Sequence, residues 1–151
     1  MAKFNLINFL AFGFGLGYAK KAPGTFGTLA GIPFILFFQQ YSLDVYLLAT
    51  VVMMLFGIWL CGASSRQMGV HDHPGIVWDE IVGYMITMIA APAGWQWLLL
   101  GFVLFRIFDI FKPWPISYLD RQVHGGLGIM ADDVLAGIMA ALVLQLFVHF
   151  Y

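Results

Sequence analysis

Residues 45–63 of the sequence, VYLLATVVMMLFGIWLCGA, contain no charged side chain. A helix needs about 20 predominantly apolar residues to cross the hydrocarbon core of a bilayer, so this stretch predicts a transmembrane helix. The overall composition agrees, because 62% of the residues are hydrophobic and 10% are charged, against about 45–50% and about 25% in soluble domains. The net charge of −1 offers no basic stripe for nucleic acid, which we exclude as a partner.

Three other apolar segments, residues 76–91, 97–108 and 134–151, are also predicted to be helices. Residues 4–18 are apolar too, but they are short for a span and have basic residues at both ends. We expect that segment to lie in the interface or to re-enter the membrane. The predicted fold is an all-α polytopic membrane bundle with about four crossing helices plus this N-terminal segment. The whole chain, residues 1–151, is expected to form a single domain.

Glycine and proline predict where the first helices break. Residues 20–28, KKAPGTFGT, are interpreted as a turn. Thr25 or Thr28 is expected to cap the following short helix, which tolerates Pro33 only if that residue lies in its first turn.

The last third of the chain contains a second group of helix-breaking proline and glycine residues. Pro113 and Pro115 are expected to end the helix before them. Residues 118–130 are predicted to be a polar, glycine-rich loop. Asp132 and Asp133 would then open the last helix, where carboxylates suit the positive end of the helix dipole.

The distribution of basic residues predicts the orientation. The turns at residues 39–44 and 92–96 contain no Lys or Arg, so four crossings place every basic loop on the opposite side, which the positive-inside rule makes cytoplasmic. If Lys and Arg are present because a functional site needs them, their positions indicate where that site lies and give only weaker evidence of the orientation in the membrane. The same topology brings seven of the eight acidic residues to this face: Asp72, Asp79, Glu80, Asp109, Asp120, Asp132 and Asp133.

Residues 105–137 concentrate ionisable side chains in an otherwise apolar chain. Such groups are costly at membrane depth, so their default interpretation is a functional site. A further acidic pair, Asp79 and Glu80, stands at the start of a predicted span. Adjacent residues point about 100° apart around a helix axis, so these two acids cannot share one narrow face. The ionisable residues of the 105–137 segment are Arg106, Asp109, Lys112, Asp120, Arg121, His124, Asp132 and Asp133.

Carboxylates gathered from three helix ends repel one another unless a proton or a cation intervenes. A divalent cation removes that cost, and oxygen ligands without a cysteine set favour Mg²⁺ or Mn²⁺ over zinc. The alternative is an internal ion-pair network. Arg106, Asp109 and Lys112 are spaced by three residues along one predicted helix face and could simply neutralise each other. That alternative leaves the two adjacent acidic pairs unexplained.

Phosphate is the natural partner of the basic residues. Arg106, Lys112 and Arg121 offer charge-assisted donors, and backbone N–H groups of the glycine-rich loop, or of the turn around Thr25, could meet an anion. Both segments are equally well explained as ordinary connectors. His124 is a candidate proton donor or phosphate contact.

Several phosphatase chemistries are excluded by spacing. Cys61 and Arg66 are separated by four residues, whereas the loop of a cysteine phosphatase needs five, and the aspartyl-phosphate signature DxDx[TV] is absent. His71 and His73 are interpreted as polar surface more readily than as metal ligands. Metal-assisted attack by water remains, with an aspartate nucleophile as a second option.

Four blocks of the sequence resemble the phosphatidylglycerophosphatase A family of bacterial membrane lipid phosphatases. They are PGTFGTLAGIP at 23–33, HDHPGIVWDEIVG at 71–83, FRIFDIFKPWPI at 105–116 and DRQVHGGLGIMADDVLAG at 120–137. The resemblance implies Mg²⁺-dependent hydrolysis of phosphatidylglycerophosphate to phosphatidylglycerol and phosphate by an all-helical protein of the inner membrane. Thr28 stands where the family pattern has Ser, and this change keeps the hydroxyl.

The resemblance also implies roles for individual residues. Arg106 and Lys112 resemble the phosphate contacts. The residues that resemble metal ligands or the water-activating base are Asp79, Glu80, Asp109, Asp132 and Asp133.

Two other functions compete with a phosphatase. A metal-ion or proton-coupled transporter would also use intramembrane carboxylates, but it predicts acids staggered along the depth of the bilayer. A lipid phosphatidyltransferase would need a DG…AR…G…D…D pattern, which is absent. The sequence leaves open the number of metal ions, the identity of the general base and the oligomeric state.

Overall fold

The computed structural model describes residues 5–70 and 73–150, and within these ranges all regular secondary structure is helical. This confirms the all-α prediction for the described part of the chain. The elements are α1 (Leu6–Ala11), η1 (Leu16–Tyr18), α2 (Pro23–Leu29), α3 (Gly31–Gln39), α4 (Leu43–Met68), α5 (Trp78–Thr87), α6 (Trp95–Phe111), α7 (Ile116–Gln122) and α8 (Gly125–Phe150).

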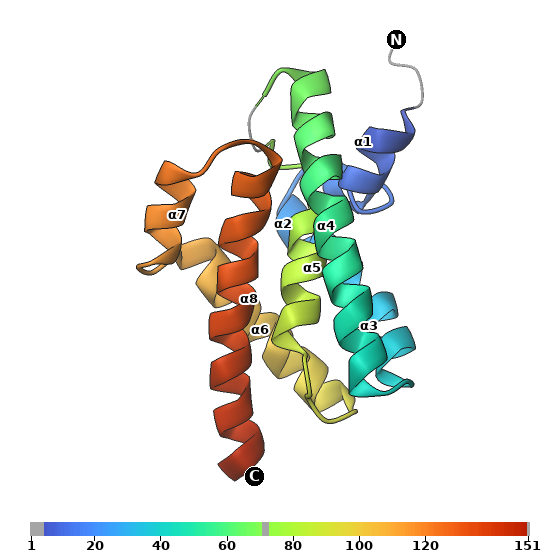
Figure 1. The fold of residues 1–151 in the computed structure, drawn as a ribbon, viewed down its shortest axis with the longest axis vertical. Helices are drawn as coiled ribbons and strands as arrows, with labels where there is room; N and C mark the ends of the chain where they lie inside the picture. The colour runs from blue at the N-terminus through green and yellow to red at the C-terminus, as the bar shows by residue number, and fades with distance from the viewer. Residues whose placement is uncertain (1–4, 71–72, 151) are drawn as a thin grey trace.

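Helices α4 and α8 are the two long elements of the bundle (Figure 1). Each has 26 residues, or about 39 Å of helix, and each is long and apolar enough to cross a membrane. Helix α4 contains the predicted span and continues through two serines, because their hydroxyls find acceptors. Ser64 Oγ donates to Asn8 Oδ1 at 2.6 Å, and Ser65 Oγ donates to the Val70 carbonyl oxygen at 2.7 Å.

Helix α5 lies at the centre of the bundle, between α4 and α8 and against α2, α3 and α6 (Figure 1). It has only 10 residues, or about 15 Å of helix, whereas a helix over residues 76–91 was predicted. Helix α6 has 17 residues, or about 26 Å. The predicted helices are therefore present, while the count of four crossings stays a prediction.

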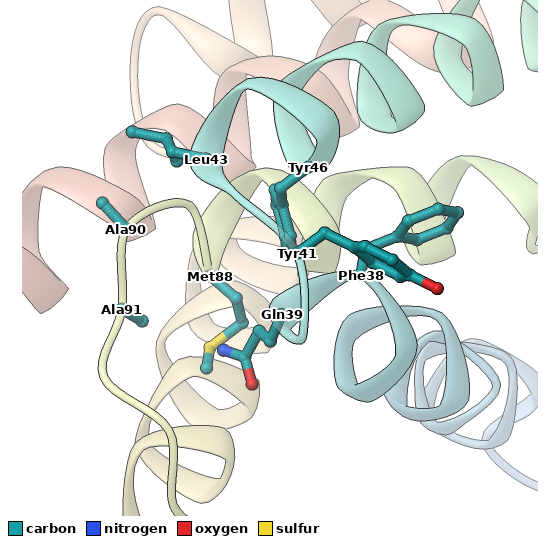
Figure 2. Close-up of a pocket in the computed structure, with 8 residues that line it drawn as sticks. All are labelled: Phe38, Gln39, Tyr41, Leu43, Tyr46, Met88, Ala90 and Ala91. Atoms are coloured by element: carbon teal, nitrogen blue, oxygen red, sulfur yellow. The ribbon is translucent and has the colours of Figure 1, made fainter.

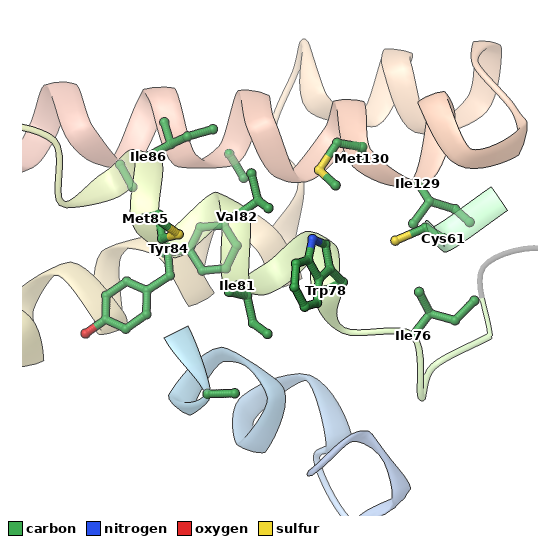
Figure 3. Close-up of a cluster of buried hydrophobic side chains, with 14 of the residues drawn as sticks. Cys61, Ile76, Trp78, Ile81, Val82, Tyr84, Met85, Ile86, Ile129 and Met130 are labelled. Carbon is green, nitrogen blue, oxygen red and sulfur yellow. The ribbon is translucent and has the colours of Figure 1, made fainter. Parts of the chain in front are cut away.

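Helix α5 has buried apolar side chains on nearly every side, as Figure 3 shows for its residues Trp78, Ile81 and Met85. A polar side-chain group and a backbone carbonyl of α5 form hydrogen bonds with α4. Trp78 Nε1 donates to the Met53 carbonyl oxygen at 3.1 Å, and the Tyr46 hydroxyl donates to the Met85 carbonyl oxygen at 2.6 Å. These bonds fix both the rotation and the height of α5 relative to α4.

The backbones of α5 and α8 approach each other closely where the two helices cross. A Cβ atom on Gly137 would lie 2.5 Å from the Gly83 carbonyl oxygen, and one on Gly83 would lie 2.9 Å from the Asp133 carbonyl oxygen. Only glycine leaves room for the two backbones here. The same Cβ atom on Gly83 would also lie 2.4 Å from Cε1 of the Phe105 ring of α6.

The N-terminal third differs from the prediction in its caps. The expected turn is itself helix α2, which begins at Pro23 with Ala22 as its N-cap, and no side chain caps it. Thr28 does not cap α3, because its hydroxyl donates to the Gly24 carbonyl oxygen at 2.6 Å inside α2. Proline at the first helical position explains why α2 starts so early. Helix α3 begins at Gly31, so Pro33 does lie in the first turn.

The predicted loop over residues 118–130 is wrong. This segment forms α7, a short link and the start of α8, which begins at Gly125. A Cβ atom on Gly126 would overlap the Ile58 carbonyl oxygen of α4, so this glycine permits close helix packing. Asp132 and Asp133 therefore lie about two turns inside α8, and the prediction that they open the last helix is wrong as well.

We predict that Gly137→Ala forces α5 and α8 apart. Overpacking of this kind lowers the free energy of unfolding by about 1–3 kcal/mol. Denaturant unfolding in detergent micelles measures the change. Leu146→Ala is the control, since Leu146 is an exposed residue of the same helix. Equal stability of the two variants would contradict the proposed crossing.

Candidate active site

Three helices bring five carboxylates into one buried cluster, which we call the acid cluster. Asp79 and Glu80 lie in the first turn of α5, Asp109 lies near the end of α6, and the last pair lies on α8. Four of the five side chains are almost fully buried, and Glu80 is half-buried. The acid cluster comprises Asp79, Glu80, Asp109, Asp132 and Asp133.

The glycine crossing explains why acids of α5 and α8 meet. Asp79 precedes Gly83 by four residues, and Asp133 precedes Gly137 by four residues. Residues four apart share a helix face, so each acid lies one turn from the glycine at which the backbones touch. The first turn of α5 also places its partial positive charge beside Asp79 and Glu80.

The acid cluster divides into two groups of three. Oxygen atoms of Asp79, Asp132 and Asp133 lie within 4.8 Å of one another, and so do oxygen atoms of Glu80, Asp109 and Asp133. Asp133 belongs to both groups. Asp79 and Glu80 serve different groups, as expected for adjacent residues that point about 100° apart.

Two cations border the acid cluster. Arg106 Nη1 forms an ion pair with Asp109 Oδ2, and Lys112 Nζ lies 3.0 Å from Asp132 Oδ2 and 3.8 Å from Asp109 Oδ1. Burial lowers the pKa of the Lys112 ammonium, but the carboxylates of Asp132, Asp133 and Asp109 outweigh this effect and raise that pKa above its ordinary value. Lys112 is therefore cationic at neutral pH.

The ion pairs confirm that Arg106, Asp109 and Lys112 share one side of α6 and its end. They do not neutralise the acid cluster, because among the described residues five carboxylates face two cations and leave a formal charge of −3. Asp133 shows this lack of compensation most clearly. It is 2% exposed, and its Oδ1 atom is buried with no hydrogen-bond donor among the described residues.

Helix α2 forms a wall of the site. The sequence suggested an anion contact in the turn around Thr25 but did not identify Gly24 as the residue that borders the site. A Cβ atom on Gly24 would lie 3.1 Å from both terminal nitrogens of Arg106 and 3.2 Å from Glu80 Oε1. Gly24 thus lets the backbone of α2 rest against a cation and an acid of the site. The PGT motif signalled a special backbone position, but its neighbours are set only by the fold.

The structure does not bring all the predicted residues together. Arg121 and His124 are exposed, and no ion pair joins Arg121 to the acids in the described part of the chain. Thr25 is half-buried and follows Gly24, which borders Arg106 and Glu80. Asp120 is exposed on α7, outside the acid cluster. His73 Nδ1 accepts a hydrogen bond from the Gly75 N–H at 2.9 Å. His71 and Asp72 lie outside the described residues.

A pocket of about 160 Å³ lies elsewhere, between the end of α3, the start of α4 and the end of α5 (Figure 2). Met88 in its wall follows Asp79 by nine residues, or about 13 Å along a helix. The lining contains no Asp, Glu, Lys, Arg or His, so it offers no acid, base or charged ligand. The residues that line it are Phe38, Gln39, Tyr41, Leu43, Tyr46, Met88, Ala90 and Ala91.

Comparison with known proteins settles the family. The sequence model of the family described as Phosphatidylglycerophosphatase A matches residues 9–148. The chain belongs to the phosphatidylglycerophosphatase A family. This confirms the resemblance seen in the four sequence blocks.

Curated relatives support the same assignment. Phosphatidylglycerophosphatase A of Escherichia coli (strain K12) is 48% identical over 141 residues, covering 93% of this chain and 82% of that protein. The protein of that name from Haemophilus influenzae is also 48% identical over 141 residues, with 92% and 86% covered. A "Putative phosphatidylinositol-3-phosphatase" of Bacteroides thetaiotaomicron is 40% identical over 134 residues, with 83% of each chain covered. No solved structure matches the chain significantly.

We predict that Asp133→Asn stabilises the protein in EDTA. The amide removes one charge from a buried group of carboxylates and can donate hydrogen bonds to them. A gain of about 1 kcal/mol raises the melting temperature by about 2–4 °C for a chain of this size. Thermal unfolding in detergent measures the shift, with the exposed Asp44→Asn as control. A lower melting temperature for Asp133→Asn would show that repulsion does not limit stability.

Proposed function

We propose that the chain is a cation-dependent lipid phosphatase that hydrolyses phosphatidylglycerophosphate to phosphatidylglycerol and inorganic phosphate. One observation carries the proposal: a family member buries five carboxylates from three helices and borders them with Arg106 and Lys112. This arrangement suits a phosphate group held between cations.

The residues fit Mg²⁺ as the cofactor. The ligand set consists only of carboxylate oxygens, which are the hard ligands that Mg²⁺ prefers. Asp133 supports this fit, because its buried Oδ1 atom has no donor among the described residues. When bound, Mg²⁺ would polarise the phosphoryl group and stabilise charge on the oxygens of an in-line displacement.

The side chains then have distinct tasks. Arg106 and Lys112 bind phosphate oxygens through charge-assisted hydrogen bonds. Arg106 keeps a donor for this purpose, since its Nε atom has no acceptor among the described residues. A carboxylate of the acid cluster takes a proton from the attacking water as the new P–O bond forms. The old P–O bond to glycerol breaks, and a proton transferred to the leaving oxygen regenerates the hydroxyl group.

The proposed location is the inner membrane, with the site at the cytoplasmic face and four crossings. Helices α4 and α8 are the candidate spans. Gly126, near the start of α8, contacts Ile58 and Gly62 in the second half of α4, so Arg66 lies at the same end of the bundle as the N-terminus of α8. The positive-inside rule favours a cytoplasmic position for this end. A lipid substrate diffusing in the same leaflet would reach the site without leaving the membrane.

An ion transporter is not favoured. A transport pathway needs polar groups distributed along the bilayer depth, whereas the five acids share one compact cluster. The choice among lipid phosphomonoesters needs its own test. The Bacteroides relative carries the name of a phosphoinositide phosphatase, so phosphatidylinositol 3-phosphate is the appropriate competing substrate.

We expect purified protein in lipid nanodiscs to release phosphate from phosphatidylglycerophosphate in Mg²⁺ and to lose this activity in EDTA. Asp79→Asn removes a charge from the acid cluster and should lower kcat by about 10²–10⁴-fold, the range typical of a lost catalytic or charge-stabilising group. Malachite-green detection of released phosphate measures the rate.

Asp44→Asn is the matched control, because it makes the same change at an exposed position on α4. Phosphatidylinositol 3-phosphate in a parallel reaction tests lipid selectivity. Ion flux into sealed vesicles without phosphate release would overturn the proposal in favour of transport.

A second prediction separates two predicted phosphate contacts. Lys112→Gln should raise KM about 10–100-fold, because a charge-assisted contact to phosphate is worth roughly 1.5–3 kcal/mol. Arg121→Gln should change KM less, since Arg121 is exposed and forms no ion pair with the acid cluster in the described ranges. Initial-rate kinetics on both variants make the comparison. A larger effect for Arg121 would reverse the ranking.

A further inference from the structure

We propose that the acid cluster binds two divalent cations side by side, with Asp133 as a ligand shared by both. The inference rests on the proposed function and adds to it the number of cations and the division of ligands between them. Asp79 and Asp132 complete one site, and Glu80 and Asp109 complete the other.

The geometry of the two groups supports separate sites. Within each group, one oxygen atom from each of three residues lies within 4.8 Å of the others. Two oxygens bound to one Mg²⁺ at about 2.1 Å lie about 3 Å apart when adjacent and about 4.2 Å apart when opposite. Each group is therefore close to the size of one coordination sphere, and side-chain rotations would bring its oxygens to ligand distance.

The direction of the α5 side chains makes a single shared site a poor fit. Asp79 and Glu80 are neighbours in the first turn of α5, so their side chains leave the axis about 100° apart. The first joins Asp132 and the second joins Asp109. A single cation would occupy one of these groups, and the three carboxylates of the other group would still lie within 4.8 Å of one another without a cation between them.

Asp133 supplies an independent observation for a shared ligand. Its side chain is 2% exposed and lies within both groups. Its Oδ1 atom is buried and has no hydrogen-bond donor among the described residues. A carboxylate has two oxygens, so it can contribute one to each of two adjacent cations.

The formal charge of the acid cluster also favours two cations over one. The acid cluster with Arg106 and Lys112 has a formal charge of −3. One divalent cation leaves a net negative charge, which repels a phosphate dianion. Two divalent cations make the site net positive, and a pair of cations can bind both the attacking and the leaving oxygen of an in-line displacement.

The experiment is a Mn²⁺ titration of the full chain in lipid nanodiscs, because Mn²⁺ accepts the same oxygen ligands and is paramagnetic. Calorimetry should give two Mn²⁺ per chain. Electron paramagnetic resonance should show a spin-coupled spectrum when the second ion binds. One Mn²⁺ per chain at saturation, or two ions without spin coupling, would overturn the proposal.

Three substitutions test the division of ligands. Glu80→Gln and Asp132→Asn should each leave one Mn²⁺ with an isolated six-line spectrum, since each removes a ligand from one site only. Asp133→Asn should abolish the coupling and weaken both sites more than tenfold. Asp44→Asn, with its exposed side chain, should retain two coupled ions. Loss of both ions in Glu80→Gln would contradict separate sites.

These experiments distinguish a failure of the cation-pair proposal from a failure of the proposed phosphatase function. One bound Mn²⁺ with full lipid phosphatase activity would refute the cation pair and keep the phosphatase. Two coupled ions without lipid hydrolysis would keep the pair and refute the phosphatase. Circular dichroism of each variant confirms that the helical fold is retained.

Discussion

The close approach of α5 and α8 positions the rest of the site. Helices in a bilayer gain no hydrophobic energy by meeting each other, so they associate by close packing, for which glycine is well suited. At Gly83 and Gly137 the two backbones nearly touch. Asp79 and Asp133 each precede one of these glycines by a single turn, so the contact that assembles the bundle also assembles the acids.

This arrangement concentrates an electrostatic cost in one place. Buried carboxylates with two nearby cations remain short of positive charge, and the apolar packing around α5 must hold them together. Active sites commonly reduce stability in this way, because groups arranged for a ligand are not arranged for one another. Divalent cations, as proposed above, would supply the positive charge that the acid cluster lacks.

Glycine accounts for most of the differences between prediction and structure. Residues 125–128 were predicted to be a flexible loop, yet they begin α8, because Gly126 lies against the backbone of α4. Glycine serves both flexible turns and close helix contacts. The residues next to a glycine in the sequence do not show which of these two uses it has. The neighbour that decides between them, Ile58, is far away in the sequence, so no local pattern could have distinguished the two uses.

The sequence by itself determined the helical class, the family and the acidic residues that the structure gathers into the acid cluster, because these follow from apolar length, composition and short motifs. Only the tertiary structure decided that α5 is a short central helix, that Gly24 borders Arg106, and that Asp133 lies in two groups of carboxylates. The physical reason is that a sequence records the spacing of residues along each helix. The distance between side chains on different helices depends on how closely their backbones can pack.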